Sequence, residues 1–166
     1  MRILKLGVIS IVVFFVLFTI IGSLFPSDIL VVKSINVNSP ADSVGTYISD
    51  FSKWNEWMEG AKTDELKVFT KDSTHAVFGN TIMTLVNKTK NSWQYNWKQG
   101  GSEQTSTITI NPAGGNSCSV IWEYKQHLPW YPWVKLASMM NDKIIGTSLE
   151  QNLANLKKAA EHQAQQ

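Results

Sequence analysis

Apolar residues recur along the C-terminal part of the chain at intervals of three or four, the spacing of one face of a helix. These positions are Leu136, Met140, Ile144, Ile145, Leu149, Leu153, Leu156 and Ala160. They predict one long helix over residues 133–161, spanning roughly 40 Å, which needs a broad apolar surface to lie on. Gly146 interrupts the pattern and indicates either close packing against a sheet or space left for a ligand.

Alternation of apolar and polar residues, with Gly, Asn and Pro between the runs, predicts short strands upstream of that helix. The predicted strands are residues 29–38, 66–69, 75–78, 81–86, 93–98, 105–111 and 117–125. After the first strand, Ser39 and Pro40 predict the start of a short helix, and Ser52 predicts the cap of a second. Short turns between the later strands favour an antiparallel meander, so the expected fold class is α+β.

The N-terminus carries a long uncharged segment. Residues 6–25 contain no charge and would cover about 30 Å as a helix, the thickness of a bilayer core. A cleaved signal peptide is the main alternative, but the segment stays apolar beyond its one small-residue pair. We therefore expect a transmembrane anchor over residues 1–27. Arg2 and Lys5 precede the span, so the positive-inside rule predicts a cytoplasmic N-terminus and an extracytoplasmic domain.

Charge and cysteine content narrow the possible partners. The chain has 166 residues, 43% of them hydrophobic, and a formal net charge of +2. Arg2 and Lys5 account for that excess, so the rest of the chain is balanced and lacks the basic surface that a nucleic-acid-binding protein needs. Cys118 is the single cysteine, which excludes an intramolecular disulfide and a cysteine-based metal cluster. We expect no nucleic-acid partner, no metal and no cofactor.

Aromatic residues gather on shared faces of the predicted elements, and seven of them are tryptophans. The rings that share a face are Trp54 with Trp57, Trp93 with Tyr95 and Trp97, and Trp122 with Tyr124. Such rings can fill a core, since each buries on the order of 150–250 Å². They can also line a cavity in which an apolar ligand stacks.

The loop at residues 128–133 combines two prolines with three aromatic residues, Trp130, Tyr131 and Trp133. The prolines stiffen the loop, and Trp and Tyr concentrate where a bilayer meets water. We interpret the three rings as a possible gate to a cavity or a contact with the headgroup region. The alternative is a packed loop that only leads into the long helix.

Two stretches resemble a known family. Residues 34–57, with the runs SINVNSPA, YISD and WNEW, look like the opening of the polyketide cyclase/dehydrase and lipid transport family of the START-like (Bet v 1-like, SRPBCC) superfamily. Residues 142–157, which begin DKIIG, are similar to its last helix. The resemblance covers residues 30–162 and implies a START-like domain over residues 28–166. It implies a helix-grip fold, in which an antiparallel sheet wraps around the C-terminal helix and leaves a cavity between them.

On this resemblance, the cavity wall should be mainly aromatic. The candidates are Trp54, Trp57, Trp93, Tyr95, Trp97, Trp122, Tyr124, Met140 and Ile144. No catalytic residue is assigned, because the histidines are scattered and form no metal-binding spacing. Alternation places Glu123 on the strand face opposite Trp122 and Tyr124, so Glu123 should face water if those rings point inward.

Three functions fit these observations. The first is a membrane-anchored domain that binds a hydrophobic small molecule or lipid and contacts the bilayer through residues 6–25. The second is an aromatase/cyclase-type enzyme in which one polar group of the cavity moves protons. The third is a ligand-free envelope interaction or stress module with a filled core. A buried acid or base in the cavity would favour the second, and a cavity too small for a ligand would favour the third.

Overall fold

The computed structural model describes residues 2–24, 26–62 and 67–163. Its helices are α1 (Arg2–Ser23), α2 (Ala41–Ser49), α3 (Trp54–Trp57) and α4 (Pro132–Gln163), with 3₁₀ helices η1 (Phe51–Lys53) and η2 (Glu59–Lys62) flanking α3. Its strands are β1 (Asp28–Val37), β2 (Val68–Thr70), β3 (His75–Phe78), β4 (Thr81–Lys88), β5 (Ser92–Gln99), β6 (Ser102–Pro112) and β7 (Cys118–His127). The helices and the consecutive strands of this structure confirm the predicted α+β class. The first residue of the predicted strand 66–69 lies outside the described residues.

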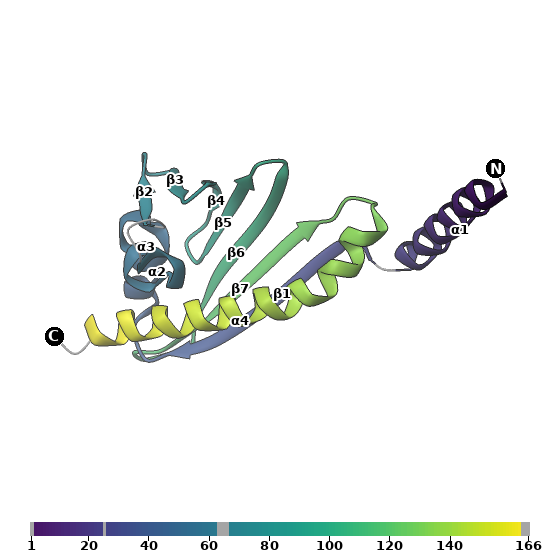
Figure 1. The fold of residues 1–166 in the computed structure, drawn as a ribbon. Coiled ribbons are helices and arrows are strands. Elements are labelled where there is room, and N and C mark those ends of the chain that lie inside the picture. Colours follow the sequence, from purple (N-terminus) through teal and green to yellow (C-terminus); the bar gives the residue numbers. More distant parts are fainter. Residues whose placement is uncertain (1, 25, 63–66, 164–166) are drawn as a thin grey trace.

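The strands form one antiparallel sheet in the order β1-β7-β6-β5-β4-β3-β2. Strands β2 to β7 pair in chain order, which confirms the predicted meander. The first strand pairs with the last, from Asp28 opposite His127 to Val37 opposite Cys118. The long strands β1, β7 and β6 therefore lie together, and α4 runs along this part of the sheet (Figure 1).

Helix α4 has 32 residues, about 48 Å at 1.5 Å per residue, and packs on what we call the inner face of the sheet. The apolar face predicted for its C-terminal half is confirmed, because Leu149 and Leu156 are buried. The upstream extension of that face is wrong at Ile144, whose side chain is 64% exposed. Ile144 borders an open cavity, and most of its side chain is in contact with solvent. The side chains of Leu136 and Met140 lie outside those described.

Gly146 of α4 lies against two side chains of β1, Lys33 and Val31. A Cβ atom on Gly146 would lie 3.1 Å from Cε of Lys33 and 3.8 Å from Cγ1 of Val31. The Lys33 ammonium forms an ion pair with Glu150, one turn further along α4, at 2.6 Å. Of the two roles considered for this glycine, close packing of helix and sheet is the one observed.

Aromatic rings form the core between the short helices and the inner face of the sheet. Trp54 lies at their centre, and its neighbours are Phe51, Trp57, Tyr95 and Trp97, with ring centroids 5.0–5.8 Å away. The backbone carbonyl of Ile48 accepts two hydrogen bonds here, from Trp54 Nε1 at 2.9 Å and from Tyr95 Oη at 2.6 Å. These bonds satisfy polar groups that would otherwise be buried without partners.

The turn between α2 and α3 is capped differently from the prediction. The carboxylate of Asp50 accepts hydrogen bonds from the backbone N–H of Ser52 at 2.9 Å and from its hydroxyl at 2.6 Å. Ser52 is therefore a donor to the cap, and Asp50 is the capping residue. A carboxylate accepts both bonds at once, and the hydrogen bonds to Ser52 lower the pKa of Asp50.

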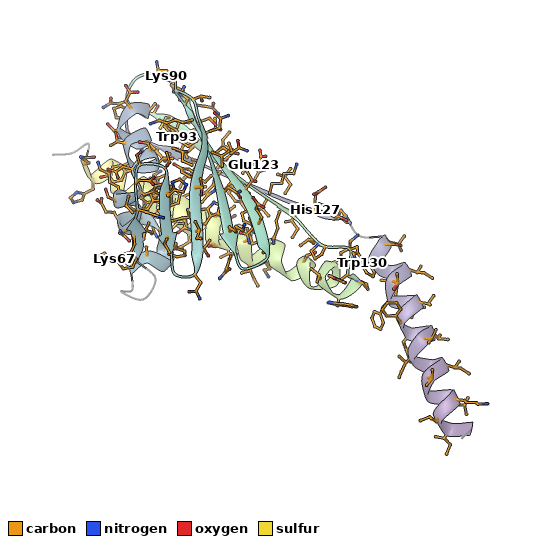
Figure 2. The ribbon with its side chains drawn as sticks, turned by 90° about the horizontal axis from the view of Figure 1, so that it is seen from above. Lys67, Lys90, Trp93, Glu123, His127 and Trp130 are labelled. Carbon is orange, nitrogen blue, oxygen red and sulfur yellow. The ribbon has the colours of Figure 1, made fainter. Side chains whose placement is uncertain are left out.

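Helix α1 projects from the end of the domain at which α4 begins (Figures 1 and 2). Its residues Ile3–Ser23 have a mean hydropathy of 2.7, which makes the helix a candidate membrane span by length and composition, although a signal sequence has the same properties. Its last turn packs against α4, where a side chain on Gly22 would collide with Pro132. Beyond α1, the backbone N–H of Leu128 donates to the carbonyl of Ser27 at 2.6 Å.

The aromatic core should dominate the stability of the domain. Replacing Trp54 with Ala removes a fully buried ring and its hydrogen bond to the Ile48 carbonyl, and leaves a cavity beside the remaining hydrogen bond from Tyr95. We expect a loss of about 3–5 kcal/mol in the free energy of unfolding, measured by urea denaturation of the full chain in lipid nanodiscs. Trp133→Ala, at a 58% exposed ring, is the control and should change it by less than about 0.5 kcal/mol.

Candidate functional site

A cavity of about 450 Å³ lies between the inner face of the sheet and the middle of α4. Strands β5, β6 and β7 supply one wall, α4 the opposite wall, and Met58, Gly60 and Phe78 close a third side. Its lining residues are Met58, Gly60, Phe78, Trp97, Gln104, Ser106, Trp122, Tyr124, Ile144, Ile145, Ser148, Leu149 and Asn152. Aliphatic and aromatic side chains provide most of this lining.

Gly60 lies directly against the Phe78 ring on the third side of the cavity, where there is no space for a side chain. A Cβ atom there would lie 2.7 Å from Cζ of the Phe78 ring. The segment that carries Gly60 is fixed to α4 by two hydrogen bonds. The Glu59 backbone N–H donates to Oδ1 of Asn152 at 2.7 Å, and Nδ2 of Asn155 donates to Oε2 of Glu59 at 2.5 Å. The third side of the cavity is therefore formed by a segment that is hydrogen-bonded to α4.

Polar side chains occupy one part of the sheet wall. Strand register places Ser106 beside Tyr124, and Gln104 beside Gln126. The Tyr124 hydroxyl donates to Oε1 of Gln126 at 3.1 Å, and Trp97 Nε1 donates to the Ser106 hydroxyl oxygen at 2.8 Å. Each of these groups is uncharged, so the wall combines apolar rings with neutral hydrogen-bonding groups.

Burial changes the acidity of the tyrosines that face inward. Desolvation raises the pKa of Tyr124 to about 12, from an ordinary value of 10.0. Desolvation also raises the pKa of Tyr95, which lies deeper in the core. At neutral pH both hydroxyls are protonated, and the Tyr124 hydroxyl already donates its proton to Gln126, so it presents an acceptor lone pair beside the cavity.

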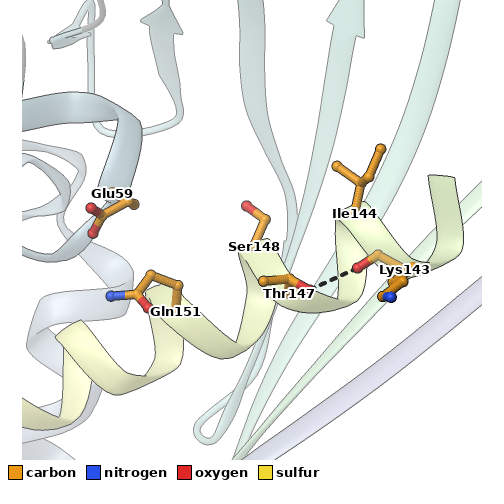
Figure 3. Close-up of a pocket in the computed structure, with 6 residues that line it drawn as sticks. All are labelled: Glu59, Lys143, Ile144, Thr147, Ser148 and Gln151. Atoms are coloured by element: carbon orange, nitrogen blue, oxygen red, sulfur yellow. Dashed lines mark hydrogen bonds between the residues drawn. The ribbon is translucent and has the colours of Figure 1, made fainter. Parts of the chain in front are cut away.

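A second hollow of about 530 Å³, which we call the outer groove, lies between α4 and Glu59 and is shown in Figure 3. Ile144 and Ser148 line both hollows, so the two adjoin along one edge of the helix. Glu59 lies across from Gln151 in this groove, and the Thr147 hydroxyl donates back to the Lys143 carbonyl at 2.9 Å. Two charged side chains near the cavity, Glu59 and Lys143, thus lie in the outer groove.

The predicted cavity wall divides into two groups in the structure. Trp97, Trp122, Tyr124 and Ile144 line the cavity. The other rings, Trp54, Trp57, Trp93 and Tyr95, lie in the core behind it. The indole of Trp93 packs under α2, because a Cβ atom on Gly45 would lie 3.2 Å from its ring. Met140 has a side chain outside those described.

The aromatic loop lies away from this cavity. Trp130 is 63% exposed, and Tyr131 stacks on Trp133 with ring centroids 5.3 Å apart. Figure 2 shows Trp130 and His127 at the end of the domain from which α1 projects. The helix runs 12 residues from Pro132 to Ile144, about 18 Å. The loop therefore lies beside α1 and apart from the described lining.

Sequence reasoning missed the polar part of the wall. Gln104 and Ser106 have the same parity along β6 as the buried residues Ile108 and Ile110. Alternation alone could have placed them on the inner face. The expected outward orientation of Glu123 is confirmed by its exposure. In the part of the chain that the structure describes, no group of three His, Cys, Asp or Glu side chains could hold a metal ion.

Comparison with known proteins agrees with this architecture. The profile of the family described as polyketide cyclase / dehydrase and lipid transport matches residues 28–161. The chain therefore belongs to this family, and the fold is the helix-grip fold of the START-like superfamily. No curated protein matches the sequence.

Solved structures share the fold at low sequence identity. A START superfamily protein from Mycobacterium smegmatis is 19% identical, with a TM-score of 0.62 over 80% of this chain and 97% of that one. Norcoclaurine synthase from Thalictrum flavum, solved with dopamine and hydroxybenzaldehyde, is 13% identical, with a TM-score of 0.62 over 86% and 91%. The di-domain ARO/CYC protein BexL is 14% identical, with a TM-score of 0.62 over 80% and 46%.

The raised pKa of Tyr124 predicts a dependence of stability on alkaline pH. The unfolded chain ionises this hydroxyl near pH 10 and the folded chain near pH 12. The stability from its neutral form is therefore present below pH 10 and is lost as pH rises towards 12. Tyr124→Phe should flatten that fall. Urea denaturation of both proteins at about pH 8 and about pH 11 measures the difference, and equal falls would contradict the assignment.

Proposed function

We propose that this protein is a membrane-anchored domain that binds a hydrophobic small molecule or lipid. Residues 1–27 form the anchor in this proposal, and residues 28–166 form the binding domain. The observation that carries the proposal is the cavity of about 450 Å³ between sheet and α4, which is within the usual size of small-molecule sites. Membership of a family whose description includes lipid transport supports it.

The proposed ligand contacts are the rings and aliphatic groups around the opening. Trp97 and Trp122 offer flat apolar surfaces, and Ile144 is an exposed aliphatic side chain at the border. A ligand would cover Ile144, so binding would remove apolar surface of both partners from water. The buried rings Trp54 and Trp57 support this surface from behind, because they contact Trp97 and Trp122 at 5.8 Å and 5.7 Å between ring centroids.

Membrane anchoring is supported by two features at one end of the domain. Helix α1 is apolar and exposed along almost its whole length. Trp130, Tyr131 and Trp133 are exposed where α1 meets the domain, and such rings favour the level of the lipid headgroups. Arg2 and Lys5 precede the helix, so we propose a cytoplasmic N-terminus and an extracytoplasmic domain.

An aromatase/cyclase-type enzyme is the alternative function. Proton transfer needs an acid or base at the reacting atoms. Among the described lining residues, Tyr124 is the sole titratable side chain, and its raised pKa keeps it protonated. No described lining residue therefore supplies a base at neutral pH, which favours binding over proton transfer.

Filling the cavity should abolish binding without unfolding the domain. Ser148 is exposed on α4 and lines the cavity, so Ser148→Trp would place an indole in the space of the ligand. We expect an apolar mass that copurifies with the wild-type chain in native mass spectrometry to be absent from this variant.

Thr147→Trp is the matched control for this experiment, because Thr147 is the adjacent exposed residue of α4 and is not part of the cavity lining. This variant should retain the bound mass. Equal ligand occupancy in all three proteins, or no bound mass in wild type after exposure to extracts and apolar compounds, would overturn the proposed function.

The aromatic loop should lie at the membrane surface. All seven tryptophans lie between residues 54 and 133, and α1 contains none. Nanodiscs made with lipids brominated near the headgroup should therefore quench only Trp130 and Trp133. We expect a quenched fraction of the fluorescence that disappears in the double variant Trp130→Phe, Trp133→Phe.

Trp93→Phe is the control for the fluorescence experiment, because this buried ring lies at the opposite end of the domain from α1 (Figure 2). It should leave the quenched intensity unchanged. If brominated lipids do not quench the wild-type protein, the loop does not contact the bilayer.

A further inference from the structure

The cavity wall carries no charge among the residues described, and this restricts the head group of a ligand. Its polar members are amides, hydroxyls and an indole, and Lys, Arg, His, Asp and Glu are missing from the described lining. An ionised carboxylate or ammonium moved from water into such a site without a partner pays a large desolvation cost.

The nearest charged groups are engaged or lie elsewhere. Lys33 pairs with Glu150 at 2.6 Å on the β1 side of α4. The Glu59 carboxylate accepts a hydrogen bond from Asn155. Lys143 lines the outer groove and not the cavity. A charged head group in the cavity would therefore lack a charged partner in the described wall.

Neutral hydrogen-bonding capacity is nevertheless available at one place in the wall. The Gln104 side chain lines the cavity and makes no hydrogen bond within the described residues. The Ser106 hydroxyl accepts from Trp97 Nε1 and keeps its own O–H as a donor. Trp122 also lines the cavity, and its buried Nε1 has no partner among the groups described.

The hydrogen-bonding groups of the wall favour a ligand that carries an uncharged acceptor oxygen on an apolar body. The amide N–H groups of Gln104 and the O–H of Ser106 can donate to an acceptor oxygen, which an alkane or an alkylammonium does not supply. The rest of the lining, including Met58, Phe78 and Leu149, needs an apolar body. A hydroxyl, ketone or amide oxygen supplies the acceptor without the desolvation cost of a charge.

We infer that the cavity takes a neutral amphipathic molecule, an alcohol, ketone or amide with an apolar body, and that Gln104 hydrogen-bonds its head group. The inference rests on the proposed binding function and specifies the ligand class for the same cavity. It also assigns Gln104 a specificity role, as the group that distinguishes an oxygenated ligand from a plain hydrocarbon.

A series of ligands that share one chain tests the inference. Dodecanol, dodecanamide, dodecanoate, dodecylammonium and dodecane are added separately to the full chain, and the bound fraction is measured by native mass spectrometry. The alcohol and the amide should bind at least tenfold more tightly than either ion. Dodecanoate bound as tightly as dodecanol would overturn the inference but leave the proposed function standing. Failure of the whole series, with no copurifying mass, would overturn both.

Two variants at Gln104 test its role directly. Gln104→Leu removes the head-group partner and should weaken the alcohol and the amide about three- to tenfold, with dodecane unchanged or tighter. Gln104→Glu adds a negative charge and should raise the affinity for dodecylammonium while lowering that for dodecanoate. If Gln104→Leu weakens dodecane equally, the effect is general packing damage. An unchanged order of affinities in both variants would remove Gln104 from the site.

Discussion

The carbonyl of Ile48 is the point on which the architecture depends. It lies in the last turn of α2, which ends at Ser49, and it accepts hydrogen bonds from the side chains of Trp54 and Tyr95. One buried acceptor thereby joins α2, α3 and the middle of the sheet, and packs their rings into a rigid core. That half of the inner face is filled, and the cavity lies over the other half, between the sheet, α4 and the segment that carries Met58 and Gly60.

The filled and the open halves also differ in chemistry. In the core half, the polar ring atoms of Trp54, Trp57 and Tyr95 donate hydrogen bonds to backbone carbonyls. The open half has neutral groups on β6 and β7, such as Gln104 and Tyr124, together with exposed apolar surface at Ile144. The buried rings can hold the cavity wall rigid, and the neutral polar groups of that wall can fix the orientation of an apolar molecule.

Periodicity predicted the elements well, because each is defined by local pattern. The apolar run gave the position of α1, the three-and-four spacing gave α4, and alternation placed Glu123 outward. The division between core and cavity could not be predicted in this way. Trp93 and Trp122 both lie on the inner face, and which of them borders the cavity depends on whether α2 covers it through Gly45. Such coverage is a tertiary property that no strand pattern contains.

The contact between Gly22 and Pro132 has a mechanical consequence. A flexible tether would let a domain tumble above a membrane, whereas here the last turn of α1 packs directly on the first turn of α4, and the Ser27 carbonyl is bonded to Leu128. With α1 in the bilayer as proposed, these contacts hold the domain at a fixed angle to its anchor. The tilt of one helix then sets the tilt of the other. The opening at Ile144, about 18 Å along α4, would keep a set height above the lipid surface.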